Sequence, residues 1–179
     1  LNADGTPRVC ERVWISSLGS ADELRTGKLT TGFGAGGSDP KIGPEFTFGL
    51  YMQKFTDTPI LIIKTAWGGK SLNTDFRSSA AGPYVFSETQ LATFQKQGKD
   101  IAAIRAAKEA ETGASYRLMI EHVKKVLGDI KGFVPDYDPK EGYELAGFAW
   151  FQGWNDLVDS GTYPNRDKPG GYDAYTSVM

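Results

Sequence analysis

The sequence predicts an α/β fold in which helices cross over between the strands of a mainly parallel sheet. Two apolar runs of strand length, at 60–63 and 144–152, are separated by a long segment with helical periodicity. A helical pattern precedes the first run, and another begins well after the second. This alternation is typical of α/β proteins, because parallel strands are joined by helical crossovers.

The N-terminal 42 residues are predicted to be largely irregular. Glycine clusters in TGFGAGGSDPKIG, and the apolar periodicity is weak. The short apolar piece Val13–Leu18 fits either a strand or a turn. A helix is predicted over 44–55, because Pro44 suits a first helical turn and Glu45 suits the positive end of the helix dipole.

The segment Ile60–Ile63 is a continuous β-branched and leucine run, bounded by Pro59 and by Gly68 and Gly69. Such a run predicts a strand buried on both faces, as in parallel sheets. The following stretch, GGKSLNTDFRSSAAGPY, is predicted to be a loop.

Residues 87–127 are helical in character. Ser87 and Gln90 have the spacing of a helix start, and Gly113 predicts a break. A loop rich in Pro, Gly and Asp follows, and ELAGFAWFQ (144–152) is then predicted to be a second buried strand. The last residues resemble the opening turns of a helix.

Composition restricts the classes of function. Twenty basic residues balance twenty-two acidic ones, so we expect neither a nucleic-acid footprint nor a membrane-binding patch. No apolar run reaches the length of a bilayer span, and LNADGTPRVCERVW does not read as a signal peptide. Cys10 and His122 are the only cysteine and histidine, so we predict no disulfide, no zinc site and no cofactor, although an oxygen-ligand site stays open. The length suggests one domain.

Unusual residues follow both predicted strands. Trp67-Gly68-Gly69-Lys70-Ser71 follows the first, and Gln152-Gly153-Trp154-Asn155-Asp156 follows the second. Ligands of parallel sheets bind beyond the carboxyl ends of strands, where glycine N–H groups and side-chain amides can converge as an oxyanion hole. The alternative interpretation is that these residues only terminate strands and cap turns.

Three stretches in order, IGPEFTFGLYM, IIKTAWGGKSL and GFAWFQGWND, resemble the SGNH hydrolase superfamily. The resemblance is closest to its sialate O-acetylesterase-like carbohydrate esterases and covers roughly residues 40–179. It implies a three-layer α/β/α domain that removes acyl groups from sugars. Many such enzymes are exported, so the resemblance makes an extracytoplasmic location plausible.

The resemblance also assigns candidate site residues. Gly69 matches the glycine that supplies a backbone donor to the oxyanion hole. The side-chain donor is either Asn155, from the general Gly-x-Asn-Asp form, or Gln152, which the esterase branch favours. The candidates for substrate binding around them are Trp67, Gly68, Gly153, Trp154 and Asp156, of which Asp156 is also expected to orient its loop.

Two family motifs are missing from this chain. Neither the Gly-Gln-Ser of the nucleophile nor the Asp-x-x-His of the base and its orienter occurs. His122 lies in MIEHVKKVL and is predicted to occupy a helix surface or boundary rather than to act as a base. The chain is therefore expected to be one SGNH-like domain, 1–179, truncated at both ends and inactive alone.

Other features of the sequence suggest three further functions. A phosphate loop needs glycine where Lys64 stands. Gly32-Phe33-Gly34-Ala35-Gly36-Gly37 spells a dinucleotide fingerprint but does not open a helix. The remaining alternative is a non-catalytic carbohydrate-binding module or pseudo-enzyme, in which Trp67 and Trp154 would stack on acylated sugars.

Overall fold

The computed structural model describes residues 1–19, 23–36, 40–159, 161–163 and 165–178. It is a mixed α/β protein that divides into two compact units. The first unit comprises residues 1–67 and 121–145, and the second comprises 68–120 and 146–179. None of the described helices combines the length and apolarity needed to traverse a bilayer.

The first unit contains a sheet of three strands in the order β2-β1-β3. The strands are β1 (Val13–Gly19), β2 (Leu24–Lys28) and β3 (Ile60–Ala66). β1 pairs with β3 in parallel, and it pairs with β2 in antiparallel orientation. The sheet is therefore mixed, and a mainly parallel sheet is not what the described residues form. The prediction of an irregular N-terminal segment was wrong where β2 forms, whereas β1 forms at the piece for which the sequence allowed a strand or a turn.

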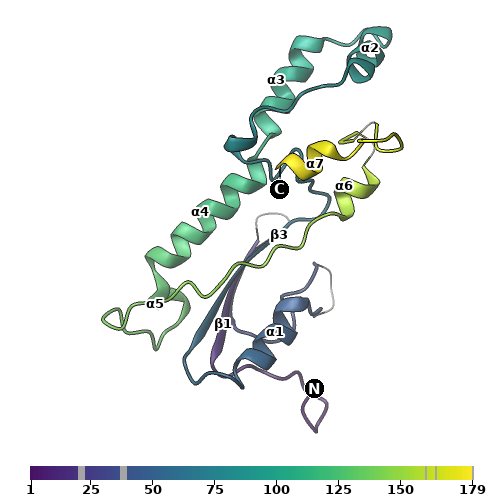
Figure 1. The fold of residues 1–179 in the computed structure, drawn as a ribbon. Coiled ribbons are helices and arrows are strands. Elements are labelled where there is room, and N and C mark those ends of the chain that lie inside the picture. Colours follow the sequence, from purple (N-terminus) through teal and green to yellow (C-terminus); the bar gives the residue numbers. More distant parts are fainter. Residues whose placement is uncertain (20–22, 37–39, 160, 164, 179) are drawn as a thin grey trace. The chain divides into compact units, whose positions relative to one another are not determined.

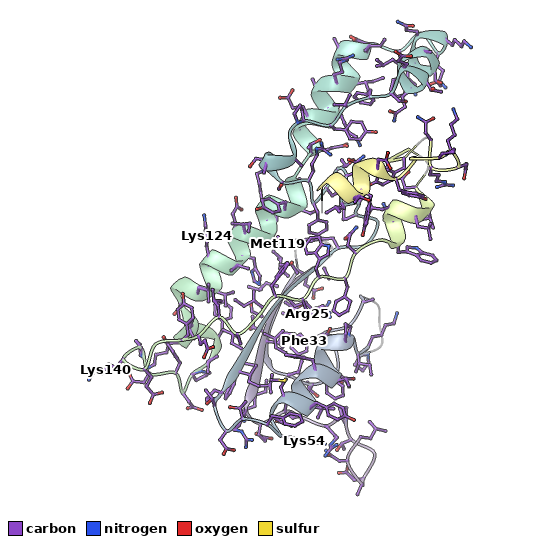
Figure 2. The ribbon with its side chains drawn as sticks, viewed as in Figure 1. Arg25, Phe33, Lys54, Met119, Lys124 and Lys140 are labelled. Carbon is purple, nitrogen blue, oxygen red and sulfur yellow. The ribbon has the colours of Figure 1, made fainter. Side chains whose placement is uncertain are left out.

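Helical segments of the first unit pack on both faces of this sheet, because alternate side chains of β1 point to opposite faces. On one face, α1 (Pro44–Met52) lies beside the strands, as Figure 1 shows. The buried cluster there comprises Cys10, Val13, Ile15, Leu29, Phe33 and Phe46. On the other face Trp14 packs with residues of α5 (Ile130–Phe133) and of the adjoining end of α4 (Ala114–Gly128). Figure 2 labels Phe33 in the first cluster.

Glycine at position 49 lets α1 approach the sheet closely. An added Cβ there would overlap with Leu29 Cδ2 and lie 3.2 Å from Val13 Cγ1. Gly49→Ala is therefore expected to cost about 1–3 kcal/mol of unfolding free energy through overpacking. The helical Gly128 has no atom within 4 Å of an added Cβ. Gly128→Ala is the matched control and should stabilise by up to about 1 kcal/mol. Equal urea midpoints for the two variants would contradict this packing.

The second unit is mainly helical. Its helices are α2 (Glu88–Lys96), α3 (Ile101–Glu111), the first part of α4, α6 (Trp154–Val158), α7 (Asp173–Val178) and the short 3₁₀ helix η2 (Ser79–Ala81). The predicted capping box is present, because Ser87 and Gln90 exchange side-chain-to-backbone hydrogen bonds at the start of α2. The predicted break is confirmed at Gly113, which has φ 73° and separates α3 from α4.

Two strand predictions need correction. Residues 144–152 form no strand, and most of them are exposed. β3 forms as predicted but lies at one edge of the sheet, so its residues are half-buried rather than buried on both faces. In both cases the apolar run indicates only a local preference for strand structure. Whether a strand pairs and becomes buried depends on neighbours that are distant in sequence.

Candidate functional site

The loop after β3 presents open backbone. Gly68 and Gly69 form a turn, and Gly69 has φ 72°, a conformation that favours glycine. An added Cβ on either residue would meet no atom within 4 Å. Within the described ranges the Gly69 N–H makes no hydrogen bond. Trp67, just before them, is half-buried.

Asp156 is the centre of the hydrogen bonds beneath this loop. It is 2% exposed and lies in α6. Its carboxylate accepts the Leu72 N–H at 3.0 Å to each oxygen and the Asn73 N–H at 3.4 Å. The Gln152 side-chain amide donates to it at 2.7 Å. A carboxylate that receives several N–H groups in this way holds the donor loop in place.

Gln152 and Asn155 differ in the availability of their amide hydrogens. Gln152 Nε2 donates both to the Lys70 carbonyl, at 3.0 Å, and to Asp156, so both of its hydrogens are used. The Asn155 side chain is half-buried and makes no hydrogen bond to any described residue. The uncommitted amide donor of this segment is therefore on Asn155.

Gly153 and Trp154 begin α6. Gly153 has φ 139°, which suits the sharp turn into the helix. The Trp154 side chain is 78% exposed, so its ring is accessible to a ligand. The third tryptophan of this region, Trp150, instead packs edge-on against Phe76 at a centroid distance of 5.2 Å.

Charged residues of the 70–86 loop serve the loop itself. Asp75 accepts hydrogen bonds from Lys70 Nζ at 3.0 Å and from the Ser71 N–H at 2.9 Å. Arg77 donates to the Gly82 and Ala81 carbonyls and to Asn73 Oδ1. Burial lowers the pKa of the Arg77 guanidinium. These contacts shape the loop, and sequence patterns did not reveal them.

A serine and a histidine form a buried pair in the first unit. His122 Nε2 lies 3.2 Å from Ser16 Oγ, and the two residues are 5% and 0% exposed. The prediction that His122 occupies a helix surface or boundary was wrong, because His122 and Val126 share the buried side of α4. Lys124 projects from its exposed side (Figure 2). Ser16 has no access to a substrate, so the pair has a structural role.

The burial of His122 predicts a pH dependence. Burial lowers the pKa of His122; the Ser16 carbonyl opposes this effect, and Lys125 adds to it. As pH falls below about 6.5, His122 therefore takes up a proton in the unfolded chain but not yet in the folded chain. The contribution of neutral His122 to the unfolding free energy is complete above that pH and is lost as pH falls towards the pKa of the folded state. We expect the unfolding free energy to fall between pH 7 and 5, by at most about 1.4 kcal/mol per pH unit.

His122→Gln should flatten this slope, because glutamine does not titrate and can still bond to Ser16. Urea midpoints measured across the same pH range test the prediction. His122 is the only histidine in the chain, so few other side chains titrate there. An unchanged slope in the variant would refute the assignment.

The second unit also contains a cavity that sequence patterns did not reveal. Its volume is about 230 Å³. It is lined by Asn73, Tyr84, Val85, Phe86, Ser87, Gln90, Thr162, Tyr163, Asn165, Gly170 and Gly171. The lining comes from three separate stretches of chain, which explains why no single motif marks it.

Comparison with known proteins identifies no relative: no family model, curated protein or solved structure matches this chain.

Proposed function

We propose that this chain supplies the oxyanion-binding part of a carbohydrate esterase that removes acyl groups from sugars. The proposed fold of the intact enzyme is the three-layer, mainly parallel α/β/α arrangement of the SGNH hydrolases. In this proposal the nucleophilic serine and its base lie outside the 179 residues, since the chain contains neither Gly-Gln-Ser nor Asp-x-x-His. The chain alone is expected not to hydrolyse aryl acetates.

One observation carries the proposal. Hydrogen bonds from Gln152 to Lys70, and from Leu72 and Asn73 to Asp156, join the two loops that the sequence marks as donor loops. Among the donors on these loops, the Gly69 N–H and the Asn155 amide make no hydrogen bond to a described residue. A backbone and a side-chain donor on neighbouring loops are the parts that an oxyanion hole requires.

These contacts support different proposed roles for the two amide residues. Asn155 is the proposed donor to the oxyanion, and Gln152 positions the Lys70 loop. Trp154 is exposed beside them and is proposed to contact the sugar, and the backbone of Gly68 and Gly153 is proposed to border the same site.

The first test is to read the gene on both sides of these 179 codons and to assay the full-length product on acetylated xylo-oligosaccharides. Asn155→Ala should lower kcat by about 10²–10³-fold, as loss of one oxyanion donor does. Trp154→Ala is expected to raise KM and to leave kcat nearly unchanged. Absence of both catalytic motifs from the gene, or an unchanged kcat in Asn155→Ala, would refute the proposal.

A second candidate function is carbohydrate binding without catalysis. The exposed Trp154 ring and the cavity of the second unit favour it. A full-length protein that binds acetylated oligosaccharides but leaves them intact would support this alternative.

A further inference from the structure

The cavity of the second unit has a mixed aromatic and polar lining. The Tyr84 and Phe86 rings contribute apolar surface and contact each other edge-on at 5.1 Å. Hydroxyl and carboxamide groups come from Ser87, Tyr163 and Asn165. Apolar walls with a few placed polar groups are typical of small-molecule sites.

Tyr163 provides the most specific observation. It is 3% exposed, and its hydroxyl makes no well-aligned hydrogen bond in the described part of the chain, although the Asp156 carboxylate lies near it. Burial raises the pKa of this phenol, and Asp156 raises it further, through its charge and as a hydrogen-bond acceptor, so the phenol remains a neutral O–H donor. A buried donor without a partner is costly, and a ligand hydroxyl in the cavity would satisfy it.

Two other lining residues retain hydrogen-bonding capacity. The Asn165 side chain makes no hydrogen bond to a described residue. Ser87 Oγ accepts the Gln90 N–H, so its own hydrogen is left for another acceptor. Tyr84 and Gln90, in contrast, bond to each other and to the Gly161 carbonyl, so they fix the wall rather than present donors.

The lining contains no ionisable acid or base other than the two tyrosines. Arg77, Lys108, Arg166 and Lys168 lie near lining residues in space or in sequence, but none of the four belongs to the lining. Arg77 donates to Asn73 and to two backbone carbonyls, and Lys108 Nζ sits 4.9 Å from the Tyr84 ring centroid and 3.8 Å from Glu111. The lining residues themselves therefore provide no counter-charge for an anionic ligand, whereas an uncharged polyhydroxylated ligand matches their hydroxyl and carboxamide groups.

The size restricts the ligand further. At about 230 Å³ the cavity lies below the range of roughly 300–1,000 Å³ that is usual for drug-sized ligands. A cavity of this volume corresponds to a single sugar ring rather than to an oligosaccharide. We propose that this cavity is a subsite for one uncharged pyranose ring, with the Tyr163 hydroxyl as its central donor. The choice of a sugar rests on the proposed function, and the inference deepens it by making the substrate a neutral glycan rather than a sialylated one.

The test uses the 179-residue chain and two probes, methyl β-D-xylopyranoside and N-acetylneuraminic acid. Amide chemical shifts are followed by NMR during titration. The xyloside should bind with a millimolar Kd and shift the amides of Ser87, Gly170 and Gly171, whereas the sialic acid should not bind. Preferential binding of the sialic acid, or binding of neither probe at millimolar concentrations, would overturn the proposal.

Tyr163→Phe keeps the ring and removes only the hydroxyl. Its Kd for the xyloside should be about threefold to tenfold weaker, the value of one hydrogen bond. Its thermal midpoint without ligand should be unchanged or higher, because the unpaired group is gone. Tyr116→Phe, on α4 away from the lining, is the matched control and should bind as the parent does. Equal affinity of the two variants would refute the role of Tyr163.

These outcomes separate the inference from the proposed function. Binding needs no nucleophile, so it can be measured on a chain that has no esterase activity. A full-length protein without esterase activity, whose chain still binds the xyloside through Tyr163, would refute the esterase and retain the subsite. An active esterase whose chain binds no neutral sugar would retain the esterase and refute the subsite.

Discussion

Lys64→Met is expected to lower the unfolding free energy by about 3–5 kcal/mol, because it leaves the buried Glu45 carboxylate without its counter-charge. Lys64 Nζ lies 3.0 Å from Glu45 Oε2, and the two side chains are 19% and 6% exposed. The same ammonium donates to the Phe33 carbonyl. The pair ties the first turn of α1 to β3, so its loss should loosen the helix from the sheet.

Three further variants define the origin of this effect. Glu45→Gln should also destabilise, since it removes the partner of a buried ammonium. The double variant Glu45→Gln/Lys64→Met leaves no buried charge and should recover part of the loss. Lys28→Met breaks the exposed pair with Glu11 and should cost less than about 1 kcal/mol. Urea denaturation measures all four, and equal losses for Lys64→Met and Lys28→Met would contradict the importance of burial.

Asp156→Asn is expected to cost about 1.5–3 kcal/mol, the value of hydrogen bonds to a charged group. The carboxylate receives N–H groups from Leu72, Asn73 and Gln152, and an amide places its own N–H₂ among these donors. The loop that carries Gly69 should therefore become mobile. In the full-length protein, kcat would fall together with stability.

Hydrogen exchange at the Leu72 and Asn73 amides gives a local measurement of this change. Both amides should exchange faster in Asp156→Asn. Asp167→Asn, an exposed aspartate of the same unit, is the control and should leave them unchanged. Unaltered protection in Asp156→Asn would show that the carboxylate does not hold the loop.

The helices were predictable where their signals are local. Pro44 and Glu45 marked the start of α1, the Ser87–Gln90 spacing marked α2, and Gly113 marked the break before α4. Each signal acts within a few residues through caps, dipoles or backbone freedom. The ends of these helices can therefore be predicted from the few residues around them.

The sheet and the buried contacts were less predictable because their partners are distant in sequence. The segment 144–152 is as apolar as a strand but has no ladder partner among the described residues, and β2 has little apolar character. Buried His122 contacts Ser16, 106 positions away in sequence. The candidate loops could be located from glycine patterns, whereas the commitment of Gln152 to Lys70 depends on folded geometry.

The unpaired segment 144–152 has a consequence for the behaviour of the chain in solution. It exposes Leu145, Phe148 and Phe151 at 72%, 77% and 80% within a stretch of nine residues that contains no proline and one charge. Apolar, β-prone segments with free backbone are the nuclei of intermolecular strand pairing. The isolated chain is therefore expected to self-associate as its concentration rises, and colloidal stability will set the conditions under which its folding and ligand binding can be measured.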